Sequence, residues 1–122
     1  MRILFVSTSL ALALALALAS AHAQDAAAGG MAFQQCAECH SPGTSDAAGP
    51  GLKGVFGRRA GAKEGFVYSP AMKKSTVVWD DSTLAAFLAN PRDVVPGTTM
   101  AYGGDDDAKE RADLVAYLKT LK

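Results

Sequence analysis

The chain has 122 residues, with 12 basic and 12 acidic side chains and a formal net charge of zero at pH 7. This balance gives no support to nucleic-acid binding, which needs a basic patch or stripe. A chain of this length forms one domain, and a domain this small buries a limited hydrophobic core. We therefore expect it to need further internal stabilisation, such as a disulfide or a bound metal.

Residues 1–23 have the layout of a signal peptide. Arg2 precedes an apolar run from Ile3 to Ala19, and Ala21-His22-Ala23 is a small-residue cleavage site. The alternative is an uncleaved membrane anchor, since the run is close to the lower limit of roughly 17 residues for a spanning helix. No basic stop-transfer cluster follows Ala23, so we expect cleavage there and a mature domain of residues 24–122.

The first helix is predicted over residues 25–38, where small or apolar residues recur at helical spacing. They are Ala26, Gly30, Phe33 and Ala37. Gly30 on this face would let another helix approach closely.

Residues 41–61 are rich in glycine and proline and follow neither hydrophobic period, which predicts an ordered loop. Loops of this length in a compact domain usually have a function or wrap something.

Two shorter helices are predicted in the middle of the chain. Ser69 followed by Pro70 is typical of an N-cap and first helical residue, and predicts a helix through Lys74. The run Asp80-Asp81-Ser82 predicts the cap of the next helix, which must stop before Pro91. The apolar face of that helix is Leu84, Phe87 and Leu88.

A second irregular run is predicted over residues 91–104, and a last helix follows it. Residues 105–107 are aspartates at the start of this helix, and Lys119 and Lys122 lie at its end; both charges are favourable with the helix dipole. Its apolar face is Leu114, Tyr117, Leu118 and Leu121. No segment alternates well enough to predict a strand, so the expected fold class is all-α, with long loops between the helices.

The residues Cys36-Ala37-Glu38-Cys39-His40 form C-x-x-C-H, the pattern of c-type haem attachment. Thiols at this spacing can add to the two vinyl groups on one edge of a haem, and the next residue, His40, then lies beneath the iron as a ligand. Three other interpretations compete. A thioredoxin-like dithiol needs a βαβ context, a zinc site needs more Cys or His than residues 24–122 contain, and a plain disulfide leaves His40 unexplained.

The sixth iron ligand is expected among the methionines, because no second histidine remains once residues 1–23 are removed. Met31 lies on the helix that leads into Cys36, so it cannot easily reach the opposite haem face. Met72 lies in a short helix, where a packing role is the usual one.

Met100 is the best-placed thioether. It follows Pro96-Gly97-Thr98-Thr99 in a loop far enough from His40 to fold over the other haem face. Ligation by histidine and methionine saturates the iron and raises its potential, which favours electron transfer over binding of oxygen or substrate.

Across residues 24–122 the chain resembles the class I cytochromes c, in particular the mitochondrial type and its bacterial relatives. Beyond C-x-x-C-H, the likeness rests on ordered segments along the whole mature chain. These are Gly49-Pro50-Gly51-Leu52, Gly54-Val55-Phe56-Gly57-Arg58, Gly65-Phe66-Val67-Tyr68-Ser69, Val78-Trp79, Leu88-Ala89-Asn90-Pro91, Pro96-Gly97-Thr98-Thr99-Met100 and Leu114-Val115-Ala116-Tyr117-Leu118. The resemblance implies the class I cytochrome c fold, in which the N- and C-terminal helices cross over a single covalent haem.

The resemblance also implies roles for individual residues. Pro50 would offer its carbonyl oxygen to the ring N–H of His40, which fixes the tautomer and raises ligand basicity. Other positions correspond to residues that bond or neutralise a haem propionate, a costly anion to bury. They are Arg58, Tyr68, Trp79 and Thr98. Gly30 and Phe33 would cross Leu114 and Tyr117, and Tyr102 would lie near the exposed haem edge.

The chain departs from the family pattern beside Met100. Phe87 stands where many members have a tyrosine that bonds the axial sulfur, and Met72 where many have an asparagine in a buried water network. We therefore expect a drier surrounding for Met100, and its weaker support makes ligand loss or low-level peroxidase behaviour a hypothesis.

The function that the resemblance implies is one-electron transfer by a monomeric carrier in a bacterial periplasm, without enzymatic activity. Expected redox partners are a cytochrome bc complex, a terminal oxidase, a photosynthetic reaction centre or a periplasmic dehydrogenase, and neither nucleic-acid binding nor stable membrane insertion is expected after cleavage. The alternatives are a haem electron-entry subunit or weak peroxidase partner of a periplasmic dehydrogenase, and a disulfide oxidoreductase without haem.

Overall fold

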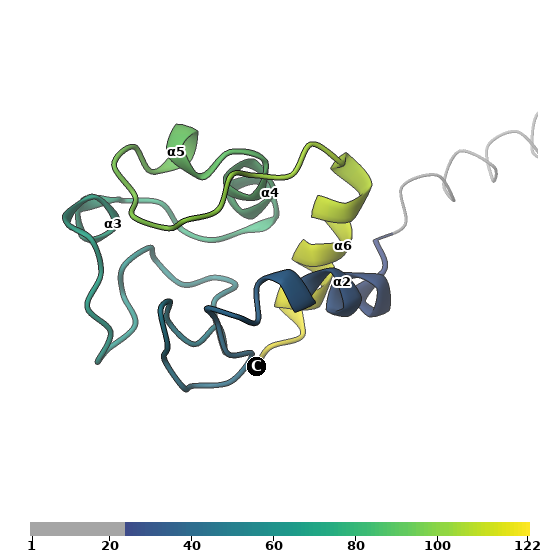
Figure 1. Cartoon of the computed structure of the whole chain (residues 1–122), viewed down its shortest axis with the longest axis horizontal. Coiled ribbons are helices and arrows are strands. Elements are labelled where there is room, and N and C mark those ends of the chain that lie inside the picture. The colour runs from purple at the N-terminus through teal and green to yellow at the C-terminus, as the bar shows by residue number, and fades with distance from the viewer. Residues whose placement is uncertain (1–23) are drawn as a thin grey trace, which may run out of the picture.

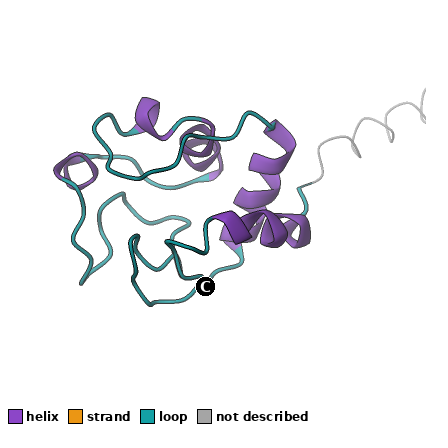
Figure 2. Ribbon diagram, viewed as in Figure 1, coloured by secondary structure: helices purple, strands orange, loops and turns teal. Residues whose placement is uncertain are grey.

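The computed structural model describes residues 24–122. The predicted signal peptide and its cleavage site lie outside them. The helices are α2 (Ala26–Ala32), the 3₁₀ helix η1 (Phe33–Gln35), α3 (Pro70–Lys74), α4 (Asp81–Ala89), α5 (Pro91–Val94) and α6 (Ala108–Lys119). Between residues 24 and 122 the only β pairing is an isolated antiparallel bridge between Arg59 and Val78. The predicted all-α class is confirmed, and long loops occupy much of the chain (Figure 2).

The helices begin where side chains cap them. The Ser69 hydroxyl accepts the Met72 N–H at 3.2 Å at the start of α3. Asp80 and Thr83 form a reciprocal capping box at the start of α4. Asp107 accepts the first amides of α6, which satisfies donors that no helical carbonyl reaches. The predicted bounds of α3 and the predicted cap of α4 are therefore confirmed.

The first helix is shorter than the sequence predicts. Its α-helical part ends at Ala32, and the Cys36 N–H then bonds the Phe33 carbonyl oxygen at 2.8 Å, the tighter 3₁₀ spacing. This tightening turns the chain, so Ala37 is exposed and lies off the helical face on which we placed it. The turn brings the C-x-x-C-H residues to the start of the loops, away from the helix axis.

The irregular run predicted over residues 91–104 is also partly wrong, because α5 occupies its first turn. The Asn90 side chain accepts the Arg92 N–H at 3.2 Å, and Pro91 follows as the first helical residue. Asn90-Pro91 thus repeats the cap-and-proline arrangement of Ser69-Pro70, a signal present in the sequence.

The terminal helices α2 and α6 cross each other at one end of the molecule. Helix α4 lies beside α6, and α3 and α5 lie toward the other end (Figure 1). The glycine at the crossing is Gly29, where a Cβ atom would overlap the Asp113 carbonyl oxygen. The predicted close approach at Gly30 is therefore displaced by one residue. Gly30 instead faces the Tyr117 ring, whose atoms would lie 3.3 Å from an added Cβ. Phe33 packs on the same ring, with centroids 5.1 Å apart.

A buried carboxylate fastens the crossing. Asp113 is only 5% exposed, and it accepts the Asp25 backbone N–H at 2.8 Å and the Lys109 ammonium at 2.7 Å. The Lys109 bond is the main cause, and the Asp25 N–H the second, of a pKa of Asp113 below its usual range. The chain entering α2 is thereby held on α6.

We expect Gly29→Ala to destabilise the fold by about 1–3 kcal/mol, the usual cost of overpacking, because backbone blocks the added methyl group. Gly30→Ala is the matched control within the same helix. There the neighbour is a ring, and alanine is favoured over glycine in a helix by about 1 kcal/mol. Denaturant unfolding of both variants measures the difference, and equal losses would contradict the assignment of the crossing to Gly29.

The lowered pKa of Asp113 also predicts an acid-sensitive fold. A depressed pKa stabilises the folded state above the unfolded value of about 3.9, and this stabilisation is lost as pH falls through the folded-state pKa. Asp113→Asn should lower the free energy of unfolding at neutral pH and flatten its fall in acid. The exposed neighbour Asp106 supplies the control Asp106→Asn, which should leave the acid limb unchanged when unfolding is followed by circular dichroism.

Candidate functional site

A cavity of about 440 Å³ lies between the loops and the helices α4 and α6. Every site residue predicted from the sequence lines it. These residues are Cys36, Cys39, His40, Pro50, Arg58, Tyr68, Trp79, Thr98 and Met100. They come from positions spread over more than half of the described residues, and the folding of the loops brings them to one cavity.

His40 is held on the cavity wall by the loop that follows it. Its Nδ1 atom lies 2.8 Å from the Pro50 carbonyl oxygen. Because a carbonyl can only accept, this contact places the ring proton on Nδ1 and leaves Nε2 as the free nitrogen. Gly49 lies close to the ring, where an added Cβ would overlap the imidazole atoms. The loop thus sets both the tautomer and the position of His40.

The two thiols lie on the same wall and are not joined to each other. Cys36 is half-buried and Cys39 is exposed. Burial is the first cause of a raised pKa at Cys36, followed by the charges of Cys39 and Glu110. A redox-active dithiol needs the opposite, a thiol whose pKa is lowered. Nor does the described part of the chain hold a group of three His, Cys, Asp or Glu side chains placed to bind a metal. Neither the dithiol nor the zinc interpretation is supported.

Met100 lies half-buried on the cavity wall, in the segment after α5. Its N–H donates to the Thr98 hydroxyl at 3.3 Å, and Thr98 is buried. The Arg92 guanidinium donates to the carbonyl oxygens of Met100 and Tyr102 at 3.4 and 3.3 Å, which ties down this segment. Met72 lines the same cavity, whereas Met31 is 78% exposed and points elsewhere.

Hydrogen bonds and ring packing hold three side chains of the cavity wall in place. Arg58 donates to the carbonyl oxygens of Lys53 and Gly51 at 3.2 and 3.4 Å. The Tyr68 hydroxyl accepts the Lys63 N–H at 3.3 Å. Trp79 packs edge-on against Phe87, with ring centroids 4.9 Å apart.

Several further residues line the cavity or shape its wall, with little or no signal in the sequence. Arg59 lines it beside Arg58, and only the adjacency of the two arginines signalled this. Ser69 lines it as well as capping α3, and the sequence showed only the cap. Gly49 was recognised within a matching segment, but its contact with the His40 ring has no sequence signal.

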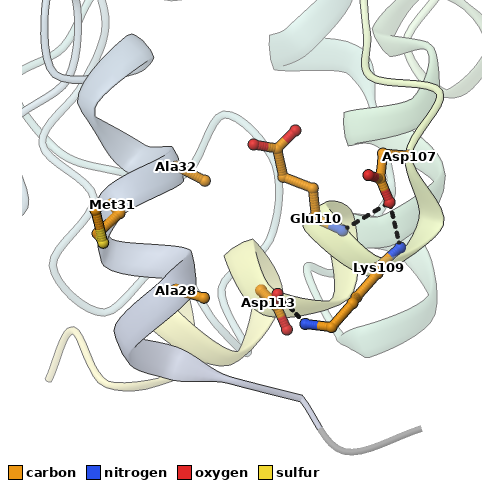
Figure 3. A pocket seen from close by; sticks show the side chains of 7 residues that line it. All are labelled: Ala28, Met31, Ala32, Asp107, Lys109, Glu110 and Asp113. Carbon is orange, nitrogen blue, oxygen red and sulfur yellow. Dashed lines mark hydrogen bonds and ion pairs between the residues drawn. The ribbon is translucent and has the colours of Figure 1, made fainter. Parts of the chain in front are cut away.

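A second, shallow hollow lies where α2 meets the start of α6 (Figure 3). Three of its polar side chains already cap α6 or pair with each other along it. Asp107 accepts the Lys109 and Glu110 amides, and Lys109 pairs with Asp113. Ala28, Met31 and Ala32 supply its other wall. The two cysteines, His40 and Met100 instead line the 440 Å³ cavity.

The described residues are similar to a known protein family. Residues 26–122 match the family model described as cytochrome c. The chain belongs to the cytochrome c family. The confirmed fold is that of a class I cytochrome c, an electron carrier built around a covalently attached c-type haem.

Individual relatives cover almost the whole described region. Cytochrome c2 of Blastochloris viridis is 44% identical over 99 residues, which are 80% of this chain and 78% of that protein. Cytochrome c of Euglena viridis is 45% identical over 100 residues, or 80% of this chain and 98% of that one. The solved structure of cytochrome cH from Methylobacterium extorquens superposes with a TM-score of 0.76 at 46% identity, covering 79% and 98% of the two chains.

The cavity of this cytochrome c fits a c-type haem. Two unpaired thiols at C-x-x-C spacing and a histidine with one free nitrogen share a wall. The remaining lining is mostly apolar, as a flat macrocycle requires, with Arg58, Arg59 and Tyr68 available for acidic groups. Gly49 leaves the space that the His40 ring fills.

We expect Gly49→Ala to displace the His40 ring, because the added methyl group would overlap it. The haem-loaded fraction should fall sharply, and the remainder should lose the low-spin absorption spectrum that requires a bound histidine. Gly103→Ala is the control, since nothing lies within 4 Å of its added Cβ. An unchanged spectrum in Gly49→Ala would show that the ring does not need this space.

Proposed function

We propose that this cytochrome c is an exported one-electron carrier whose iron is bound by His40 and Met100, with Cys36 and Cys39 as the thioether anchors. The observation that best supports this proposal is the 2.8 Å contact between His40 Nδ1 and the Pro50 carbonyl oxygen, in a cavity that Met100 also lines. That contact leaves Nε2 as the only ring nitrogen available to a metal.

The haem supplies reversible one-electron chemistry at its iron. The chain holds it in place and controls its surroundings. Pro50 orients His40, and the Thr98 hydroxyl and Arg92 hold the backbone around Met100. Arg58, Tyr68, Trp79 and Thr98 are the proposed partners of the propionates, whose charge is costly to bury alone. Since His40 and Met100 would both hold the iron from anchored segments, little rearrangement would accompany electron transfer.

The proposed site of action is the periplasm of a bacterium, reached through a signal peptide at residues 1–23. The proposed partners are membrane complexes or dehydrogenases that exchange single electrons, namely a cytochrome bc complex, a terminal oxidase, a photosynthetic reaction centre or a periplasmic dehydrogenase. The similarity to proteins named cytochrome c2 supports this class of partner. Among residues 24–122, no helix has the length and apolar character needed to cross a membrane.

One observation favours a second activity, weak peroxidase chemistry. Phe87 and Met72 line the cavity with Met100, and neither can donate a hydrogen bond to its sulfur. No hydrogen bond to that sulfur occurs within residues 24–122. An iron–sulfur bond without such support dissociates more readily, and an open sixth position is what peroxidase action requires.

Two measurements on the purified protein test the carrier. The mass should equal that of residues 24–122 plus one haem, with no free thiol. The ferric spectrum should show the weak long-wavelength sulfur-to-iron band and resist cyanide and azide. A haem-free mass would refute the carrier, and rapid cyanide binding would favour the peroxidase.

Met100→Leu should abolish the sulfur-to-iron band and lower the reduction potential, because the thioether favours the reduced iron. The fall should be a sizeable share of the ~0.8 V over which axial ligands set haem potentials. Met72→Leu is the matched control, since it removes the other thioether of the cavity at nearly constant volume. It should keep the band. Loss of the band in Met72→Leu alone would identify Met72 as the ligand.

A further inference from the structure

The peptide group between Pro50 and Gly51 is hydrogen-bonded at both of its ends. Its carbonyl oxygen, on Pro50, accepts from His40 Nδ1 at 2.8 Å. Its N–H, on Gly51, donates to Asp46 Oδ1 at 2.8 Å. A peptide group is planar and its C=O and N–H point in opposite directions, so one rigid unit joins His40 to a carboxylate.

Asp46 is held in this position as an anion. Lys63 Nζ lies 2.9 Å from Asp46 Oδ1 and 3.1 Å from Oδ2. The Gly51 N–H is the main cause, and the Lys63 ammonium the second, of a lowered pKa of the Asp46 carboxyl group. The two side chains are 29% and 17% exposed, so water screens the pair only in part. The carboxylate is therefore charged at neutral pH and close to a fixed geometry.

We propose that Asp46 is a positioning residue for His40 that acts through the Pro50–Gly51 peptide and lowers the reduction potential of the iron. Hydrogen bonds in a chain polarise one another, so an anion at the N–H end makes the carbonyl oxygen at the other end a stronger acceptor. A stronger acceptor draws the Nδ1 proton and makes the imidazole a more basic ligand, as a carboxylate does when it bonds a metal-bound histidine directly. A more basic ligand favours the oxidised iron.

Lys63 has the opposite electrical effect from Asp46. Its ammonium withdraws charge from the same carboxylate, and its backbone N–H donates to the Tyr68 hydroxyl on the cavity wall. The pair therefore joins the loop of His40 to the loop of Tyr68. Removing the charge of Asp46 should raise the potential, whereas removing the charge of Lys63 should lower it. A purely mechanical link between the loops would move both variants in the same direction.

The inference rests on the proposed ligation by His40, and the test uses the haem-loaded protein. Asp46→Asn keeps an oxygen that can accept the Gly51 N–H but loses the charge. Lys63→Gln removes the opposing charge. Glu64→Gln is the matched control, because it removes one negative charge from the exposed residue next to Lys63. Spectroelectrochemical titration gives the potential of each, and thermal unfolding confirms that each is folded.

Asp46→Asn should raise the ratio of reduced to oxidised protein at a fixed solution potential at least threefold, which equals about 28 mV at 59 mV per factor of ten. The Glu64→Gln shift should be smaller, and Lys63→Gln should move in the opposite direction. In NMR spectra of the reduced protein, the His40 Nδ1 proton should move upfield in Asp46→Asn and stay in place in Glu64→Gln.

The proposal is overturned if Asp46→Asn and Glu64→Gln give equal shifts, if Lys63→Gln moves with Asp46→Asn, or if the His40 proton does not respond. Failure of the proposed function gives a different result. In that case the wild-type mass lacks a haem, or the His40 ring shows no ligation.

Discussion

The crossing of α2 and α6 at Gly29 is the contact on which the cavity depends. It brings the first and last helices of the described region together, with backbone meeting backbone at the Asp113 carbonyl. The chain leaving α2 turns at once into Cys36 and His40, while α6 presents Leu114 and Leu118 to the cavity. Without the crossing, the haem-binding wall and the helix behind it would have no fixed relation, because the loops between them lack regular secondary structure.

Loops this long must satisfy their backbone groups without helices or sheets, and here side chains supply much of what is missing. Asp46 accepts the Gly51 amide, Arg58 donates to two carbonyls, and Arg92 donates to two others. These same residues surround the cavity or support its lining. Order in the loops and order in the site therefore have one cause.

The sequence predicted where helices begin better than which residues meet when the helices pack. Cap residues predicted the starts of α3 and α4, and the spacing of the cysteines predicted a c-type haem. Periodicity placed the tight crossing at Gly30, because it reports that a face is apolar but not which residue meets the partner backbone. Asp46 had no signal at all. Its role depends on Gly51 and Lys63, and contacts between loops leave no period in a sequence.

The two sides of the proposed iron site differ in how the protein can act on them. On the His40 side, a run of hydrogen bonds extends through a peptide to Asp46 and Lys63, so a charge outside the cavity reaches the ligand. On the Met100 side, Phe87 and Met72 line the cavity, and no hydrogen bond to the Met100 sulfur occurs within residues 24–122. A thioether is a weak acceptor and offers little for a protein charge to act through. Substitutions that change the reduction potential while both ligands stay bound should therefore be found on the histidine side. Substitutions that free a coordination position of the iron should be found on the methionine side.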